Sequence, residues 1–361
     1  MMKSYFKAGL FIAVIFIISI SAGCKGRQKM EVPDIKMITS ENVHGVIALD
    51  DDNIWITGNY GVIYHSSDGG ENWTKQDSGI KESILCDGVF LDTSTGWVVG
   101  INGTVLHTTN GGSTWTRQNI GTDRHLFGIC FSDENHGWAV GEWHTIIHTT
   151  DGGKTWEKQG EEKDKILNNI FFVDNDEGWL VGERGIIMHT TDGGANWTAQ
   201  VPEAFARESF EDFLMEPPPS LFGMCFTDRN NGWACGIDGT IVKTIDGGET
   251  WEVLPTVTEQ TLYTIFIKYG KGWVVGDKGT YLMSGDGGST WVFPEEVIKS
   301  KKPLRDIYFS SLQKGWAVGA GGTVVRTIDS GETWKFRSGL SYAMKFFQMP
   351  KALEFKGMVT E

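Results

Sequence analysis

Seven copies of a short motif, Thr-x-Asp-Gly-Gly-x-x-Trp, place an oxygen-bearing side chain at one repeated position. These side chains are Asp68, Asn110, Asp151, Asp192, Asp246, Asp286 and Asp329. Carboxylates could bind a cation or transfer a proton, but metal coordination needs several oxygens that converge on one point. The aspartate can instead accept hydrogen bonds from amides of its own turn, and the glycines supply positive φ. We therefore predict structural turns, no catalytic residue, no metal and no cofactor.

Four histidines share another position of the repeat, at the end of the third predicted strand. They are His65, His107, His148 and His189. Histidines in register suggest a metal site, but the same position continues as Lys243, Met283 and Arg326, which are poor zinc ligands. A strand position that faces the surface is the favoured interpretation.

Four cysteines follow Cys24, namely Cys86, Cys130, Cys225 and Cys235. Cys225 and Cys235 lie symmetrically about Asn230 in one predicted hairpin, where directly opposed residues can reach disulfide distance. Two buried thiols are the alternative, because the register of the strands is only inferred. No Cys-x-x-Cys is present, so redox catalysis has no support.

The first 23 residues have the pattern of an export signal. Lys3 and Lys7 precede an apolar run from residue 8 to residue 20, and Ser-Ala-Gly then leads into Cys24. This resembles the lipobox of bacterial lipoproteins, which implies acylation of Cys24 and a tether over residues 24–42. An uncleaved membrane anchor is the alternative, but the run is short for a spanning helix. We expect an exported protein at the periplasmic face, on the outer membrane if the host is Gram-negative.

The elements that position these residues come from a repeat of about 41 residues. The first motif ends at Trp73, Trp115, Trp156, Trp197, Trp251, Trp291 and Trp334. A second motif, Gly-Trp-x-Val-Gly, has its tryptophan at Trp97, Trp138, Trp179, Trp233, Trp273 and Trp316, with Trp55 as a degenerate copy. The first strand of a repeat is predicted to end on an aromatic residue seven positions before the second-motif tryptophan, at Phe90, Phe131, Phe172, Phe226, Phe266 and Phe309.

Each repeat predicts four short strands bounded by glycine-rich turns, which is typical of a propeller blade. We predict an all-β, seven-bladed β-propeller of four-stranded antiparallel blades over residues 43–337. Either residues 43–50 or residues 343–349 supply a strand that closes the ring, and residues 338–361 form a tail or that strand. The formal net charge of −14 argues against nucleic acid as a partner.

The first motif resembles the Asp-box, or bacterial neuraminidase repeat. Its pairing with Gly-Trp-x-Val-Gly-x-x-Gly-Thr resembles the photosystem II stability and assembly factor family of propellers. The resemblance implies a non-catalytic exported protein that binds a client protein during assembly of a membrane complex. The client would be a photosystem subunit if the host is photosynthetic, and the site would be the thylakoid lumen side in a cyanobacterium.

Sialidases also contain Asp-boxes, so a glycan-binding or sialidase-like glycan-cleaving propeller of the cell envelope is the rival function. Such an enzyme needs an arginine cluster and a Tyr–Glu pair in a central cleft, and glycosidases generally need two facing carboxylates. No carboxylate outside the turns is distinguished by the sequence, and the prediction is that the protein is not an enzyme.

An insertion accounts for the longest spacing between repeats and covers residues 201–220. Ala206, Phe210, Phe213 and Leu214 follow helical spacing, and three prolines follow them. We predict a short amphipathic helix between blades four and five. Its apolar stripe packs on the propeller or serves as a lid that binds a partner, in which case Phe210 and Phe213 make the contact.

Trp143 is the one tryptophan outside both motifs, in the turn between the second and third strands of blade three. Glu142 and His144 flank it. An aromatic residue in a turn is a candidate hot spot for a partner, and packing on a neighbouring blade is the alternative. The matching turns contribute Tyr60, Arg184, Asp238 and Lys278 to the predicted partner surface.

Overall fold

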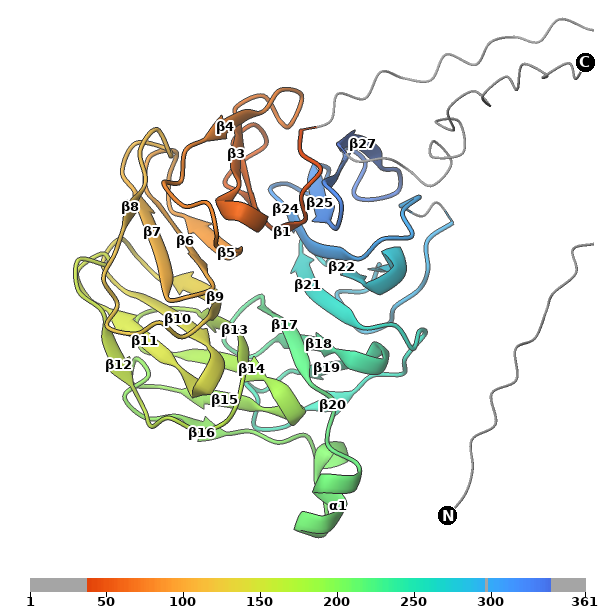
Figure 1. The fold of residues 1–361 in the computed structure, drawn as a ribbon. Coiled ribbons are helices and arrows are strands. Elements are labelled where there is room, and N and C mark those ends of the chain that lie inside the picture. The colour runs from red at the N-terminus through yellow and green to blue at the C-terminus, as the bar shows by residue number, and fades with distance from the viewer. Residues whose placement is uncertain (1–37, 296–297, 339–361) are drawn as a thin grey trace, which may run out of the picture. The chain divides into compact units, whose positions relative to one another are not determined.

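The computed structural model describes residues 38–295 and 298–338, and these residues form seven antiparallel sheets around a central axis (Figure 1). The predicted seven-bladed propeller is confirmed. The export signal, Cys24 and residues 343–349 lie outside the described residues. Within the described part of the chain, no helix has the length and hydrophobicity needed to cross a membrane.

Each blade takes consecutive strands, named A to D from the axis outward. The strands of blades one to three are β1 (Val43–Ala48), β2 (Ile54–Gly58), β3 (Ile63–Ser66), β4 (Thr74–Gln76), β5 (Leu85–Phe90), β6 (Gly96–Gly100), β7 (Thr104–Thr108), β8 (Thr116–Arg117), β9 (Leu126–Phe131), β10 (Gly137–Gly141), β11 (Ile146–Thr149) and β12 (Glu157–Gln159). Because the strands alternate in direction, A–B and C–D turns share one face, and B–C and D–A turns share the other.

Blades four to seven repeat this order. Their strands are β13 (Leu167–Phe172), β14 (Gly178–Gly182), β15 (Ile187–Thr190), β16 (Thr198–Ala199), β17 (Leu221–Phe226), β18 (Gly232–Gly236), β19 (Ile241–Thr244), β20 (Glu252–Val253), β21 (Leu262–Lys268), β22 (Lys271–Gly276), β23 (Tyr281–Ser284), β24 (Leu304–Phe309), β25 (Gly315–Gly319), β26 (Thr323–Thr327) and β27 (Lys335–Ser338). Blade six has three strands, and its fourth is reduced to the bridge between Met283 and Val292.

The second-motif tryptophans join neighbouring blades. Trp138 of blade three is fully buried, and its indole Nε1 donates a hydrogen bond of 2.9 Å to the Gly193 carbonyl in the C–D turn of blade four. The corresponding bond to the next blade is made by Trp55, Trp179, Trp233, Trp273 and Trp316. The tryptophan of the second motif and the turn of the first motif therefore form one contact between neighbouring blades.

The aromatic residue at the end of strand A stacks on the tryptophan of the preceding blade. Phe172 lies 3.6 Å from Trp138 between ring centroids, with the rings nearly parallel. The prediction that strand A of blade six ends on Phe266 is wrong. Ile267 pairs with Gly272 in blade six, and this is the pair that Phe90 makes with Gly96 in blade two. The A–B turn of blade six is shorter than that of blade two. Phe266 therefore lies one position before the place that Phe90 has in blade two, and it pairs with Trp273.

The ring closes by contact between complete blades. β1 pairs with β2 inside blade one, so residues 43–48 form the first strand of that blade as expected. The Val46 amide donates a hydrogen bond of 2.8 Å to Asp306 of blade seven, and Trp316 Nε1 donates one of 3.2 Å to the Gly69 carbonyl. No strand is exchanged across this seam among the residues that the structure describes.

Candidate functional site

The seven motif turns use their oxygens internally. In blade three, Thr149 Oγ1 donates to Asp151 Oδ1 at 2.9 Å, and the Thr155 amide donates to the same oxygen at 2.9 Å. These hydrogen bonds hold the pKa of the Asp151 carboxyl below its usual range. Asp68, Asp192, Asp246, Asp286 and Asp329 accept equivalent bonds, and Asn110 does so through its amide oxygen.

The four histidines in register stack on the second-motif tryptophans of their own blades. Centroid separations run from 4.2 Å for His65 on Trp55 to 4.7 Å for His148 on Trp138. Burial lowers the pKa of His65, His107 and His148. Among the described residues, no three His, Cys, Asp or Glu side chains are grouped as a metal site requires.

Cys225 and Cys235 do not face each other in their hairpin. Cys225 pairs with Trp233, and Cys235 pairs with Gly223, so the two thiols are diagonal neighbours and both are free. Burial raises the pKa of Cys225 to about 11 and that of Cys235 to about 12. The arrangement is that of two protected thiols, the alternative to a disulfide.

The Trp143 turn is a strained segment of the B–C face. Glu142–His144 form a 3-10 turn in which Trp143 (φ 58°) and His144 (φ 57°) both adopt left-handed backbone conformations. Successive non-glycine residues in that region carry a conformational cost and cluster at functional sites. Trp143 is 41% exposed, and the guanidinium carbon of Arg124 lies 4.9 Å from its ring centroid.

The other predicted turn residues adopt the same local geometry. Tyr60, Arg184, Asp238 and Lys278 each have a φ between 52° and 57° in a 3-10 turn that joins strands B and C. This backbone shape projects the side chain from the face, and Tyr60 is 64% exposed. The four residues lie on four separate blades, so they share one face without forming one cluster.

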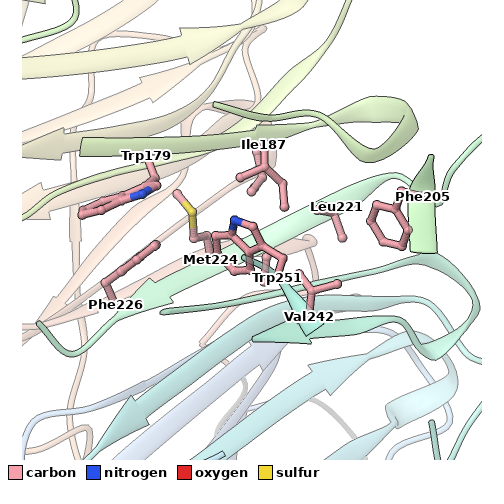
Figure 2. Close-up of a cluster of buried hydrophobic side chains, with 10 residues drawn as sticks. Trp179, Ile187, Phe205, Leu221, Met224, Phe226, Val242 and Trp251 are labelled. Atoms are coloured by element: carbon pink, nitrogen blue, oxygen red, sulfur yellow. The ribbon is translucent and has the colours of Figure 1, made fainter. Parts of the chain in front are cut away.

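The insertion is anchored by Phe205, not by the expected stripe. Phe205 belongs to the short 3-10 segment Glu203–Phe205 and is only 5% exposed. Figure 2 shows it beside Leu221 at one end of the buried side chains between blades four and five. The helix α1 (Phe210–Met215) has Ser209 as its N-cap and begins four residues after the expected first member of the stripe, Ala206. Leu214 is 55% exposed, and α1 projects from the outer edge of the ring (Figure 1).

A cavity of about 510 Å³ lies between the insertion and the B–C turn of blade four. Ile187, Met188 and Phe205 are among the apolar residues of its wall. Lys165 and Arg184 lie over the ring of Phe213, with their charged ends 5.8 Å and 6.0 Å from its centroid. The Phe210 side chain lies outside the described part of the structure.

The Trp143 turn and this cavity form one continuous surface. The His144 amide donates a hydrogen bond of 2.6 Å to the Lys165 carbonyl, and Lys165 also lines the cavity. Burial lowers the pKa of the His144 imidazole. We call the region of Arg124, Trp143, Lys165, Arg184 and Phe213 the blade three–four surface.

A second cavity, which sequence reasoning missed, lies on the propeller axis. It has a volume of about 600 Å³ and is lined by A strands, including Asp87 of blade two and Asp306 of blade seven. Burial raises the pKa of Asp87 to about 6 and that of Asp306 to about 7. In the sequence, this site is indicated only by an aspartate inside the otherwise apolar first strands of blades two and seven. The other blades have glycine or a neutral polar residue at that position.

Comparison with known proteins gives a family match. The model of the family described as photosynthesis system II assembly factor YCF48 matches residues 117–204 and 203–302. The photosystem II assembly protein Ycf48 of Thermosynechococcus vestitus is 33% identical over 54 residues. That alignment spans 15% of this chain and 16% of the relative.

Solved structures agree on the fold. A structure of YCF48 bound to D1 peptide has a TM-score of 0.67 at 22% identity, with coverage of 81% of this chain and 95% of that chain. Enzymes share the same architecture, since virginiamycin B lyase from Staphylococcus aureus has a TM-score of 0.65 at 14% identity, with coverage of 80% and 94%. Both likenesses concern the fold alone.

Proposed function

Since this chain belongs to the family described as photosynthesis system II assembly factor YCF48, we propose that it is a protein-binding assembly factor for a membrane complex. The observation that carries the proposal is the blade three–four surface. There the longest departure from the repeat builds an apolar cavity, and two cations border it. Binding sites on rigid scaffolds are commonly built from such loops.

The chemistry of this surface suits an extended peptide segment with apolar and acidic side chains. The cavity wall offers Ile187, Met188 and Phe205 to an apolar side chain. Lys165 and Arg184 offer charge-assisted hydrogen bonds to a carboxylate, and Trp143 offers a large flat contact area. Glu142 is held by the segment that leads into β9, because its Oε1 accepts the His125 amide at 3.0 Å.

We infer that the client is an integral membrane protein, or a segment of one exposed at the membrane surface. A related propeller has been solved with a D1 peptide, which supports a client of this class. A photosystem subunit is the expected client if the host is photosynthetic. Tyr60, Asp238 and Lys278 lie on other blades of the same face and would extend the contact with a larger client.

We propose further that the protein is non-catalytic and is held at the outer side of the membrane by a lipid on Cys24. Labelling with a radioactive fatty acid, compared between the natural protein and Cys24→Ser, tests the anchor directly. Retention of label in Cys24→Ser would contradict it. The rival glycan function lacks support at the axis, because no arginine is among the described residues that line that cavity.

The decisive experiment is a crosslinked pull-down of the tagged full-length protein from membranes of its source organism. Arg184→Ala and Phe213→Ala variants should lose the client, because they remove the cation and the ring at the cavity. Glu249→Ala is the matched control, since Glu249 is an exposed residue of a C–D turn on the opposite face. It should recover the same client as the natural protein.

Equal recovery by all variants would remove the blade three–four surface from the proposal. Enrichment of envelope glycans in place of any membrane protein would favour the glycan-binding alternative.

A further inference from the structure

We propose that the axial cavity is a binding site for a protonated alkyl amine. This inference is independent of the client surface, because the cavity is built from the second half of the A strands and from the A–B turns. Its mouth includes Leu49, Thr227 and Tyr269, at the A–B end of their strands. A ligand would thus enter from the face opposite the B–C turns.

Two carboxyl groups face this cavity from either side of blade one. Asp87 and Asp306 occupy the same position of strand A in blades two and seven, where they pair with Val99 and Val318. Gly45 has that position in blade one and pairs with Thr57, so no side chain of blade one separates the two carboxyls. Burial is the main cause of the raised pKa of Asp306, and the charge of Asp87 raises that pKa further.

The carboxyls also hold neighbouring blades together, and each uses both of its oxygens to accept backbone amides. Asp306 Oδ2 accepts the Val46 amide at 2.8 Å, and Asp87 Oδ2 accepts the Ile129 amide at 3.1 Å. Asp87 Oδ1 also accepts the Gly88 amide at 2.7 Å, and Asp306 Oδ1 accepts the Ile307 amide at 2.8 Å. An asparagine oxygen could keep the bond to the neighbouring blade, and blades four and six have neutral Asn169 and Thr264 at this position. When ionised, these two buried carboxyls place negative charge on the wall of one cavity, and an organic cation in the cavity would compensate that charge.

Aromatic rings supply the rest of the wall. Phe171, Phe266 and Tyr308 all pair with the second-motif tryptophan of their own blades and line the cavity. The rings of Phe266 and Tyr308 lie 4.8 Å apart. The one-residue shift of blade six is what brings Phe266 to this position. Aromatic faces beside carboxylates favour an organic ammonium over a metal ion, which would need more oxygen ligands.

The A–B turns at the cavity mouth carry acidic side chains, some of them paired with Arg229 or Lys314. The A–B turns on that face begin with an aspartate in five blades, at Asp50, Asp92, Asp133, Asp174 and Asp228. Lys268 is at the mouth, but its Nζ donates to the Ser310 carbonyl at 3.4 Å and lies 5.2 Å from the Tyr269 ring centroid. Its charge is therefore engaged at the rim of the cavity.

Calorimetric titration of the full-length protein with n-butylamine at pH 8 tests the site, with n-butanol as the uncharged probe of the same shape. We expect saturable binding of the amine and at least about tenfold weaker binding of the alcohol. Asp87→Asn and Asp306→Asn should each weaken amine binding about tenfold while keeping an oxygen for the blade contact. Phe266→Leu provides a second test that leaves both acids in place.

Equal binding of amine and alcohol, unchanged binding in the Asn and Leu variants, or no binding of the amine would each overturn the proposal. Arg184→Ala should bind n-butylamine like the natural protein, which separates this site from the client surface.

Titration with an acetylated, amidated tripeptide that has a central lysine identifies the source of the ligand. Tighter binding of the peptide than of n-butylamine would indicate a lysine side chain of another protein, and weaker binding would indicate a free amine.

Discussion

At the residue scale, Trp138 shows the two ways in which a second-motif tryptophan can stabilise the propeller. Its ring is enclosed between His148 of its own blade and Phe172 of the next blade. Its indole nitrogen also donates to a C–D turn of the next blade. Stacking supplies buried area, whereas the hydrogen bond fixes the position of one blade against another.

A comparison of two tryptophans separates these contributions. Trp97 has the same stacked surroundings as Trp138, but its Nε1 has no hydrogen-bond partner among the described residues. We expect Trp138→Phe to reduce the free energy of unfolding by about 1 kcal/mol more than Trp97→Phe does. Urea unfolding followed by circular dichroism measures the difference. Equal losses would show that the indole hydrogen bond contributes nothing net.

The raised pKa of Asp306 leads us to predict that the stability of the folded protein depends on pH. Burial raises its pKa in the folded protein to about 7, from 3.8, so the folded state binds the proton more tightly than the unfolded state. The free energy of unfolding that protonated Asp306 contributes therefore falls as pH rises from about 4 to about 7. Above that range the contribution is lost in full. The other titratable groups of the cavity wall are Asp87, Cys225, Lys268, Tyr269 and Tyr308.

Asp306→Asn should remove that titration. Relative to the natural protein, we expect the variant to gain on the order of 2 kcal/mol in the free energy of unfolding between pH 5 and pH 8. Urea unfolding at both pH values measures this change. Parallel pH profiles for the two proteins would contradict the assignment.

At the element scale, the insertion combines one buried anchor with an exposed helix. Phe205 is enclosed between blades four and five (Figure 2). Leu214 of α1, in contrast, is largely exposed. The turn of blade four contributes to this packing, because a side chain at Gly185 would lie 2.8 Å from Pro218 and 3.0 Å from Phe205. The cavity of the blade three–four surface thus depends on Phe205 more than on the helix.

Phe205→Ala should release the insertion while the blades remain folded. We expect cleavage by trypsin after Arg207 to become at least about tenfold faster, because the segment would open without global unfolding. Leu214→Ala is the control and should be cleaved like the natural protein. Unchanged cleavage of Phe205→Ala would show that other contacts hold the insertion.

At the scale of the whole molecule, the ring is held shut by contacts between blade one and blade seven. Glu71 of blade one accepts hydrogen bonds from Arg337 at 2.7 Å and 2.9 Å, and from Arg326 at 2.9 Å. Asp51 accepts a bond of 2.7 Å from Ser310 at the same seam. Because no strand is exchanged among the described residues, such contacts join the first blade to the last.

Glu71→Ala should weaken the seam. We expect a loss of about 1 kcal/mol in the free energy of unfolding at low salt, and a smaller loss at high salt, because the pairing is partly exposed. Glu249→Ala alters the same position of the motif in blade five and should change stability by less than about 0.5 kcal/mol. Thermal melts at two salt concentrations measure both, and equal losses in the two variants would remove the seam as the cause.

The sequence by itself determined the repeat, the number of blades and the identity of the turn residues. This was possible because each blade folds by contacts within about 40 residues, so a local pattern such as Asp151 to Trp156 specifies its own turn. The family resemblance rested on the same local motifs. The position of Trp143 in a B–C turn was also readable, because it breaks a regular pattern.

Only the tertiary structure decided what residues on different blades do together. Asp87 and Asp306 are 219 positions apart and meet at the axis because the ring closes. The stacking of His148 on Trp138 and the register that separates Cys225 from Cys235 depend on strand pairing, in which a shift of one residue changes every neighbour. Likewise, Phe205 was not recognisable as the anchor of the insertion, because the surface that buries it comes from blades four and five.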